Sequence, residues 1–427
     1  MDSVLILSAL FLLLFCGIPV GLSLTAVGTL LFLFKGIPLA GIPEDFLGSF
    51  NSFILLAVPI FLLTSNILLR AGVAKDLFDA VQRWVGSIRG GVAVSTILSC
   101  GIFAAISGSS VAVAAMIGTV AIPEMTRRGY DQRFVMGTLA AGATLGILIP
   151  PSIPLIVYAS VTEQSTASMF LAGVGPGLLL IAAFVAYCVV KSFLGGAPVT
   201  ETGDETEQRK SLLRVSLKAF PTMLIAITMI GGIYAGIFTP TESAAVGLIM
   251  TLVYVFTFRD SFGFAELRGA VFQSGATTAN LLLIIGGANV FGKAILLYRI
   301  PFEISTWITD NIASAGVFIL VVVLLLVVLG LFLEGIAMIL IVLPVLLPAL
   351  GVHGIDPVWF GIFFVLMIEL ALITPPVGMN LFVIQSVAKS DLSEVIYGVI
   401  PYAVIMMAMV ALIYAFPMIV LYIPFFG

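Results

Sequence analysis

The sequence predicts an all-α polytopic membrane protein, built as an inverted-topology repeat with two re-entrant helical hairpins and two broken helices. The chain has 427 residues, of which 61% are hydrophobic and 9% are charged, whereas soluble domains carry about 25% charged residues. Several apolar stretches exceed the ~20 residues that a helix needs to cross a bilayer. Two of them contain consecutive prolines, Pro150-Pro151 and Pro375-Pro376, which remove backbone donors and interrupt a helix. A matched pair of interrupted segments is typical of a transporter's binding site.

The composition excludes several functional classes. A net charge of −4 without a large basic patch predicts no nucleic-acid partner. Cys16, Cys100 and Cys188 lie in apolar stretches without metal or disulfide spacing, so we expect them to be small core residues. Residues 287–294 resemble a phosphate-binding loop but end in Ala where Ser or Thr must bind magnesium. We therefore expect neither an enzyme nor an ATP-driven pump. No basic region precedes the first apolar run, so no cleavable signal peptide is expected.

Residues 1–194 are predicted to form the first repeat. The apolar run at residues 4–34 is interrupted around Pro19, and it forms either one long kinked helix or two short ones. Residues 70–89 place basic side chains among apolar ones, which is typical of an arm lying along the membrane interface. Residues 134–158 contain the first proline pair and are predicted to be a broken helix, which is tolerated only inside protein or beside a wet cavity.

Residues 91–123 are predicted to be the first re-entrant hairpin, split by the sequence Ser-Gly-Ser-Ser at residues 107–110. Each limb is shorter than the ~20 residues of a full crossing. Basic residues flank the segment on both sides, so both ends should face the cytoplasm. The alternative is two ordinary crossings joined by a tight turn. The flanking cations are Arg83, Arg89, Arg127, Arg128 and Arg133.

A polar linker at residues 195–218, expected in the cytoplasm, separates the halves. Residues 219–427 are predicted to form the second repeat. The second repeat is expected to contain an arm at 298–311, a hairpin at 317–350 and a broken helix at 359–384. This hairpin is split at Glu334-Gly335 and has almost no flanking cations, so we expect it to enter from the outer face.

The two halves match in order and nearly in spacing. Gly108 at the first tip pairs with Gly335 at the second, and Pro150 pairs with Pro375, at nearly constant offsets. The charged flanks change sides between the halves. This combination indicates an inverted-topology repeat, in which the hairpin tips and helix breaks meet near the middle of the membrane.

The tips and breaks carry the predicted chemistry. Each of them ends one helix and begins another, so free carbonyl groups favour cations and free N–H groups favour anions. Nearby hydroxyl and amide side chains add oxygens that suit a hard monovalent cation such as sodium. The alternative is that these hydroxyls bond back to the backbone. The side chains are Ser107, Ser109, Ser110, Thr144 and Ser152 in the first half and Thr374 and Asn380 in the second.

Two acidic residues, Glu334 and Glu369, lie inside apolar segments. An ionisable group at membrane depth is by default a functional hypothesis. The alternatives are that Glu334 is solvated near the surface and that Glu369 is hydrogen-bonded to a neighbouring helix. The first half has no matching acid beside its break, which favours a cation held by neutral oxygens over a proton relay.

Four runs carry a resemblance to a known family. They are residues 104–115 (AAISGSSVAVAA), 142–152 (GATLGILIPPS), 332–338 (FLEGIAM) and 374–380 (TPPVGMN). With them, the chain resembles the large membrane (M) subunit of tripartite ATP-independent periplasmic (TRAP) transporters, of the DctM or SiaM type, over essentially its whole length.

The resemblance implies an elevator-type ion transporter fold in the bacterial inner membrane. It implies sodium-driven import of an organic acid, commonly sialic acid or a four-carbon dicarboxylate. It also implies a small four-helix membrane (Q) subunit and a periplasmic substrate-binding (P) protein as partners. A stand-alone sodium/organic-anion symporter and, less favoured, a channel remain as alternatives.

The family's sites, carried onto this chain, give at least two sodium ions. One lies between residues 107–110 and 146–152, the second lies between residues 334–335 and 374–380, and the organic anion binds between them. The expected sodium-site residues are Ser107, Gly108, Ser109, Gly146, Pro150, Glu334, Gly335, Thr374, Pro375 and Gly378. The expected substrate-site residues are Ser110, Pro151, Ser152, Met379 and Asn380.

Overall fold

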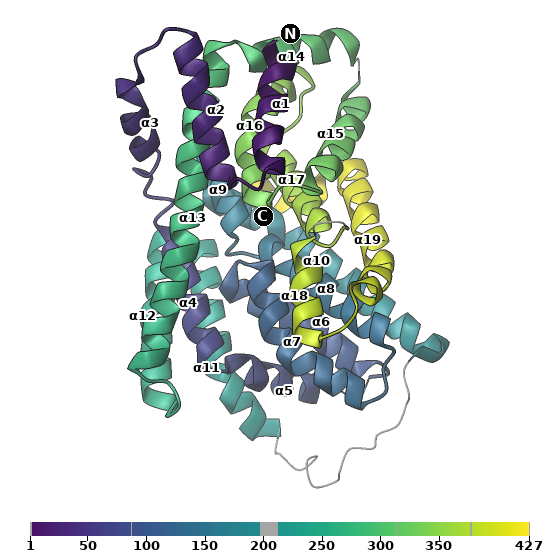
Figure 1. The fold of residues 1–427 in the computed structure, drawn as a ribbon. Helices are drawn as coiled ribbons and strands as arrows, with labels where there is room; N and C mark the ends of the chain where they lie inside the picture. The colour runs from purple at the N-terminus through teal and green to yellow at the C-terminus, as the bar shows by residue number, and fades with distance from the viewer. Residues whose placement is uncertain (1, 87, 197–211, 313, 376–377, 427) are drawn as a thin grey trace.

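The computed structural model describes residues 2–86, 88–196, 212–312, 314–375 and 378–426, and these ranges are helical with short connections. Within them, seven helices are long and apolar enough to cross a membrane, judged by length and composition, with α8 and α9 counted together as one. The central part of the predicted linker and Pro376 lie outside the described residues. The chain is therefore an all-helical protein of many membrane spans (Figure 1).

The helices of the first half begin with two short ones, so the first apolar run is not a single long helix. They are α1 (Asp2–Phe15), α2 (Val20–Phe34), α3 (Ile42–Gly48), α4 (Ala57–Arg70), α5 (Val73–Val85), α6 (Gly91–Ser107), α7 (Ser110–Arg127), α8 (Gln132–Leu148), α9 (Ile153–Thr162) and α10 (Thr166–Lys191), with short turns at Leu39–Gly41 (η1) and Ser192–Gly196 (η2).

The helices of the second half follow a similar order. They are α11 (Leu212–Tyr234), α12 (Pro240–Phe258), α13 (Phe264–Leu297), α14 (Ile300–Asn311), α15 (Ala315–Gly330), α16 (Gly335–Val352), α17 (Pro357–Leu372), α18 (Met379–Ala388), α19 (Leu392–Ala415) and α20 (Met418–Phe426).

The amphipathic segment of the first half turns sharply away from the preceding helix. α4 and α5 are bent by 76° relative to each other, and Gly72 at the corner has a φ of +67°. α5 buries one face, including Leu77 and Phe78. In Figure 1, α5 lies at the bottom of the molecule and its counterpart α14 lies at the top.

Helix ends fall at the predicted interruptions, within a few residues of the predicted segment limits. α6 ends at Ser107 and α7 begins at Ser110, while α8 ends at Leu148 and α9 begins at Ile153. In the second half the corresponding interruptions separate α15 from α16 and α17 from α18. Each half thus contains one short helix followed by two interrupted helix pairs.

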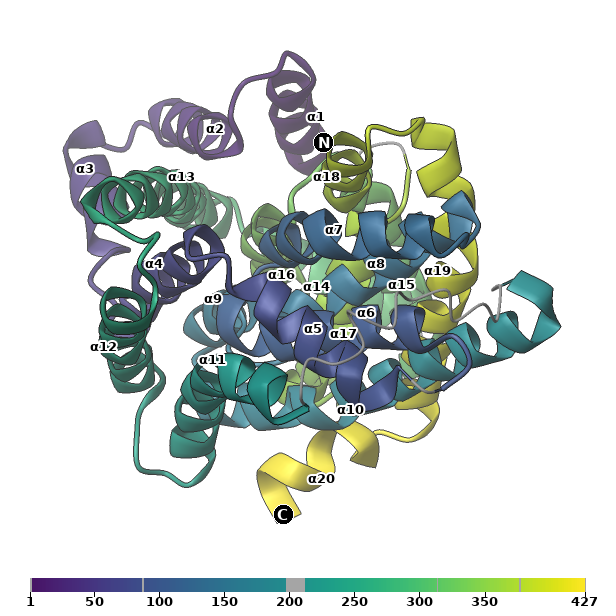
Figure 2. The same cartoon turned by 90° about the horizontal axis from the view of Figure 1, so that it is seen from below.

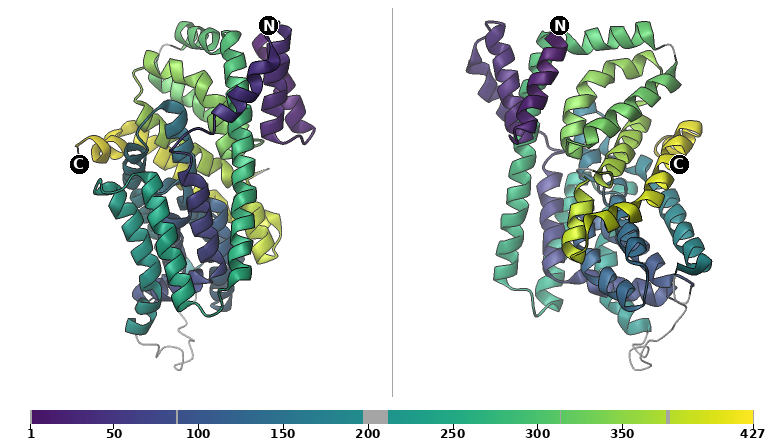
Figure 3. Two further views of the ribbon diagram at one scale, coloured as in Figure 1. Left: turned by 90° about the vertical axis from the view of Figure 1, so that its left-hand side faces the viewer. Right: turned by 45° about the vertical axis from the view of Figure 1, so that its right-hand side comes forward.

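The helices form two groups that both mix the halves. α13 packs along α2 and α4, and α19 packs along α8. Seen from below, α2, α3, α4, α12 and α13 lie on one side, and α6, α7, α8 and α17 lie together on the other (Figure 2). Figure 3 shows α13 along the height of the molecule and α20 projecting at one side. The interrupted helices therefore lie beside one another in the second group.

Candidate functional site

The tip between α6 and α7 packs directly against the break between α8 and α9. Gly108 sits in the left-handed region at φ +60°, and a Cβ there would lie 2.6 Å from the carbonyl oxygen of Pro151. A Cβ at Gly146 would lie 2.9 Å from the backbone N and Cα of Ser110. Real Cβ atoms do not approach backbone so closely, so both glycines are required for this contact. The structure thus brings together the residues expected to form the first sodium site.

The hydroxyl groups at the tip stabilise helix ends. The Ser109 Oγ accepts a bond from the Ala112 N–H at 3.4 Å and caps α7. The Ser107 Oγ lies 3.5 Å from the Ser109 nitrogen. A hydroxyl that accepts one such bond keeps a second lone pair, so capping leaves an oxygen able to meet a cation.

The hydroxyl groups at the break also bond to the backbone. The Ser152 Oγ donates to the Ile147 carbonyl and accepts from the Leu155 N–H, which caps α9. The Thr144 Oγ1 donates to the Ala141 carbonyl at 2.7 Å. The hydroxyls of Thr144 and Ser152 therefore bond back to the backbone, which was the alternative to cation binding that the sequence left open.

Glu369 reaches from the second half into this first-half contact. Its side chain is fully buried on α17. The Ile147 N–H donates to Glu369 Oε1 at 3.2 Å, and the Ser110 Oγ donates to Glu369 Oε2 at 3.4 Å. One carboxyl group therefore joins the break of α8 to the start of α7. This is the hydrogen-bonded role that the sequence left open, although the partner helices belong to the other half.

Asn380 near the start of α18 has a buried side chain without a partner. Its exposed fraction is 0%, and neither its Oδ1 nor its Nδ2 has a hydrogen-bond partner among the described residues. Buried polar atoms are nearly always satisfied in folded proteins, and an exception calls for a missing ligand, ion or water. Asn380 was expected at the substrate site.

The tip between α15 and α16 packs against α17. A Cβ at Gly335 would collide with Ile368, and one at Gly330 would collide with Ala371. Glu334 precedes α16 at the N-cap position without a side-chain capping bond. The second tip therefore lies beside the segment that carries Glu369.

Two hydrogen bonds involve the residues close to the C-terminal end of α17. The Thr374 Oγ1 donates to the Leu370 carbonyl at 2.6 Å, and the Gly378 N–H donates to the Thr374 carbonyl at 3.1 Å. The Thr374 hydroxyl is thus held by its own helix end. Pro375 and Met379 lie on either side of residues 376–377, which are outside the described residues.

Several polar contacts between the halves were missed in the sequence. The Thr138 and Tyr402 hydroxyls are 2.7 Å apart and buried. The Arg133 guanidinium donates to both oxygens of Glu394 at 2.8 and 3.1 Å. A tyrosine within the long apolar run of α19 was the available signal, but nothing in the sequence identifies its partner. These contacts join α8 to α19.

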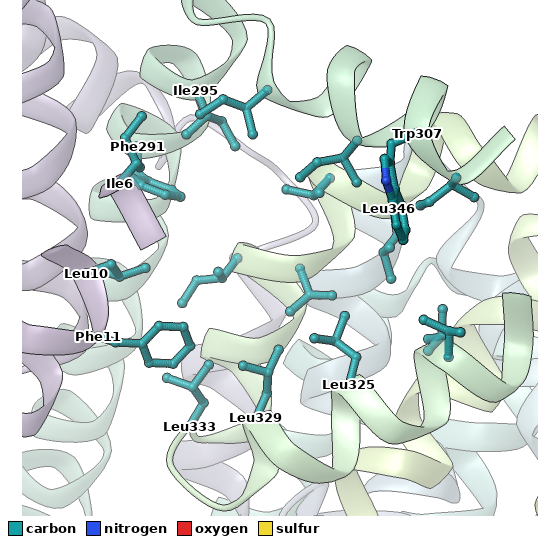
Figure 4. A pocket seen from close by; sticks show the side chains of 18 of the residues that line it. Ile6, Leu10, Phe11, Phe291, Ile295, Trp307, Leu325, Leu329, Leu333 and Leu346 are labelled. Carbon is teal, nitrogen blue, oxygen red and sulfur yellow. The ribbon is translucent and has the colours of Figure 1, made fainter. Parts of the chain in front are cut away.

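A carbon-lined cavity of about 280 Å³ has none of these polar groups in its lining. α1, α13, α14, α15 and α16 surround it, with Leu10, Trp307, Leu325 and Leu346 among its lining (Figure 4). Its apolar lining does not suit an organic anion. Among the described residues, no group of three or more His, Cys, Asp or Glu side chains can hold a metal ion.

The chain matches the family described as tripartite ATP-independent periplasmic transporter, DctM component, over residues 7–419. It is 39% identical over 381 residues to the C4-dicarboxylate TRAP transporter large permease protein DctM of Pseudomonas aeruginosa, covering 87% of this chain and 86% of that protein. It is 34% identical to the sialic acid TRAP transporter large permease protein SiaM of Vibrio cholerae, covering 96% of each. It is 32% identical to the isethionate TRAP transporter permease protein DctMQ of Oleidesulfovibrio alaskensis, covering 94% of this chain and 62% of that protein.

Two solved structures share the fold at low sequence identity. Neisseria gonorrhoeae MtrF matches with a TM-score of 0.64 and 14% identity, covering 92% of this chain and 87% of that one. The Alcanivorax borkumensis YdaH transporter matches with a TM-score of 0.63 and 16% identity, covering 90% and 88%. At this level of identity the likeness concerns the arrangement of helices alone.

Proposed function

The chain belongs to the DctM family, the large permease component of TRAP transporters, and from this membership we propose that it imports an organic acid in symport with sodium. It is a multi-pass permease of a bacterial transporter and not an enzyme. The observation that carries the proposal is the family match over residues 7–419. The matched range includes both tips and both breaks.

Sodium coupling is supported by the geometry of the first tip and break. Two helix ends meet there at backbone-to-backbone distances that only glycine permits, and a buried carboxylate and hydroxyl groups lie beside them. Helix C-termini and hydroxyl oxygens suit a small cation. We propose one ion between residues 107–110 and 146–152, and a second between residues 334–335 and 374–380.

An inverted repeat that works as an elevator is supported by the arrangement of the helices. The order of arm, split pair and split pair recurs in each half, and the arms α5 and α14 lie at opposite ends of the molecule (Figure 1). In the proposed motion, the tips and breaks travel together while the group around α13 remains still.

The substrate class is proposed from the relatives together with the charge of the site. Relatives named for C4-dicarboxylates and for sialic acid match at 39% and 34% identity. Neither tip nor break contains an arginine, so we propose that backbone N–H groups, hydroxyls and bound sodium hold the anion. A sialic acid or a four-carbon dicarboxylate fits this description.

Two protein partners are part of the proposal. A small four-helix Q subunit would enlarge the membrane part, and this is supported by the DctMQ relative, of whose length this chain spans 62%. A periplasmic P protein would deliver the substrate. A stand-alone symporter would transport free substrate without such a protein, and a channel would conduct without saturation.

Uptake into proteoliposomes tests the proposal. The permease is reconstituted with its Q subunit under an inward sodium gradient, and candidate P proteins are supplied with labelled ligand. We expect saturable uptake that requires sodium and one particular P protein. A potassium gradient of equal size and ligand-free P protein are the controls. Uptake of free substrate without any P protein would instead identify a stand-alone symporter, and sodium-independent flux would refute the coupling.

A further inference from the structure

Glu369 is an acidic residue in the interior of the protein, on α17. Its side chain is fully buried, and among the residues that the structure describes it takes part in none of the ion pairs. A buried carboxylate without a counter-charge is strongly unfavourable, so such groups are paired, bind a cation or become neutral. The groups that surround Glu369 therefore indicate which of these three possibilities applies.

The groups around Glu369 favour its ionised form. The backbone N–H of Ile147 can only donate a hydrogen bond, and it donates to Glu369 Oε1 at 3.2 Å. Glu369 Oε2 lies 3.4 Å from the hydroxyl of Ser110, the first residue of α7. The start of a helix carries a partial positive charge and stabilises an anion. These hydrogen bonds favour the charged form of Glu369, whereas its burial opposes that form unless a cation lies beside it.

The unpartnered amide of Asn380 lies at the same level as Ser110. Val387 of α18 lies 3.3 Å from the position that a Cβ of Gly118 in α7 would take. α8 follows α7 and α19 follows α18, each after a short connection. The ion pair between Arg133 and Glu394 joins the first turns of α8 and α19, so α7 and α18 end on the same side of the molecule and run parallel. Seven residues earlier, about 10 Å up each helix, are Asn380 and Val111, the neighbour of Ser110. Two independent anomalies, an uncompensated carboxylate and an orphaned amide, therefore occupy one layer.

We propose that Glu369 is a direct ligand of a transported sodium ion, held together with the hydroxyl of Ser110 and the amide oxygen of Asn380. This inference rests on the proposed sodium coupling, and it adds a carboxylate and an amide from the second half to the contact between the first tip and its break. The three oxygens are the hard donors that such a cation requires. The ion supplies the counter-charge of Glu369 and the partner of Asn380 in one step.

Sodium-dependent thermal stability tests the site without measuring transport. The permease, purified with its Q subunit, is unfolded by heat across a NaCl titration, with choline chloride keeping the ionic strength constant. A ligand that binds only the folded state raises Tm as its concentration exceeds Kd. We expect Glu369→Gln to shift the sodium midpoint upward by on the order of 10- to 100-fold, as for the loss of a charged contact. Glu44→Gln, at an exposed position on α3, should leave it unchanged.

Asn380→Ala provides a second and independent reading. The amide has no hydrogen-bond partner among the described residues, so its removal should leave the Tm measured without sodium unchanged or slightly higher while the sodium midpoint rises. This variant decides the matter if Glu369→Gln does not fold.

The outcomes separate the inference from the proposed function. A wild-type sodium response that is unchanged in both Glu369→Gln and Asn380→Ala overturns the inference and leaves sodium coupling intact. A wild-type protein that does not respond to sodium overturns both.

Discussion

Replacing Gly146 by alanine is expected to separate the first tip from its break. The new methyl group would lie 2.9 Å from the backbone of Ser110, and backbone atoms cannot rotate away as a flexible side chain can. Overpacking of this kind costs about 1–3 kcal/mol. Inside a helix, alanine is about 1 kcal/mol more favourable than glycine, so the free energy of unfolding of the whole protein should change little. The strain should instead be relieved by movement of the tip, residues 107–110, away from the break.

The cost to function follows from the same numbers. If the tip must return against a strain of about 1–3 kcal/mol for sodium to bind, the apparent sodium affinity falls roughly 5- to 150-fold, at 1.4 kcal/mol for each factor of ten. Sodium titration of P-protein-dependent uptake in proteoliposomes measures this change. Gly231→Ala is the matched control, because a Cβ at this helical position on α11 meets nothing within 4 Å.

The result that refutes this reasoning is specific. Equal sodium midpoints for Gly146→Ala and Gly231→Ala, with both proteins folded, would mean that the contact between tip and break does not form part of the sodium site. A lower maximal rate at an unchanged midpoint would place the effect of Gly146 on the transport motion instead.

Three further predictions concern single side chains. Ser109→Ala removes the cap of α7, which is worth about 0.5–2 kcal/mol, and should weaken the sodium dependence of uptake. The control Ser314→Ala, which removes the cap of α15, should lower Tm alone. Equal sodium midpoints for the two variants would contradict this prediction. Glu334→Gln should reduce sodium-driven uptake more than Glu44→Gln, because only Glu334 lies at a tip, and similar small effects in both would make it a bystander. Val322→Phe fills part of the carbon-lined cavity and should raise the free energy of unfolding by about 0.5–2 kcal/mol; a lower Tm would mean that the cavity walls cannot accept the ring.

The interruptions of the helices were predictable because their causes are local. A pair of prolines at Pro150 and a Ser-Gly-Ser-Ser tip stop a helix whatever surrounds them, and α8 and α6 end within a few residues of these positions. The short helix α5 with one buried face was predictable for a similar reason, since its pattern of charged and apolar residues belongs to one short segment.

The partners of the buried polar groups were not predictable, because their contacts join residues far apart in the chain. Glu369 bonds to Ile147 and Ser110, which lie 222 and 259 residues away. Periodicity places an acid within a helix but does not specify which helix covers it. The same limit applies to Thr138 and Tyr402. The hydroxyl of Ser152 illustrates a different limit, because a serine before a helix serves equally well as a cap or as a ligand.

The contacts between the halves constrain how the proposed elevator can move. Glu369 joins α17 to α7 and α8, and the ion pair between Arg133 and Glu394 joins α8 to α19. On the other side, the Asn66 Nδ2 donates to the Ser274 Oγ at 2.9 Å and joins α4 to α13. Each group therefore contains helices of both halves, so the boundary of motion cannot run between the repeats. α13 and α14 pack against α16 beside the carbon-lined cavity, and an apolar contact can shift without leaving polar groups unpaired. That boundary is where the sliding surface of the permease should lie.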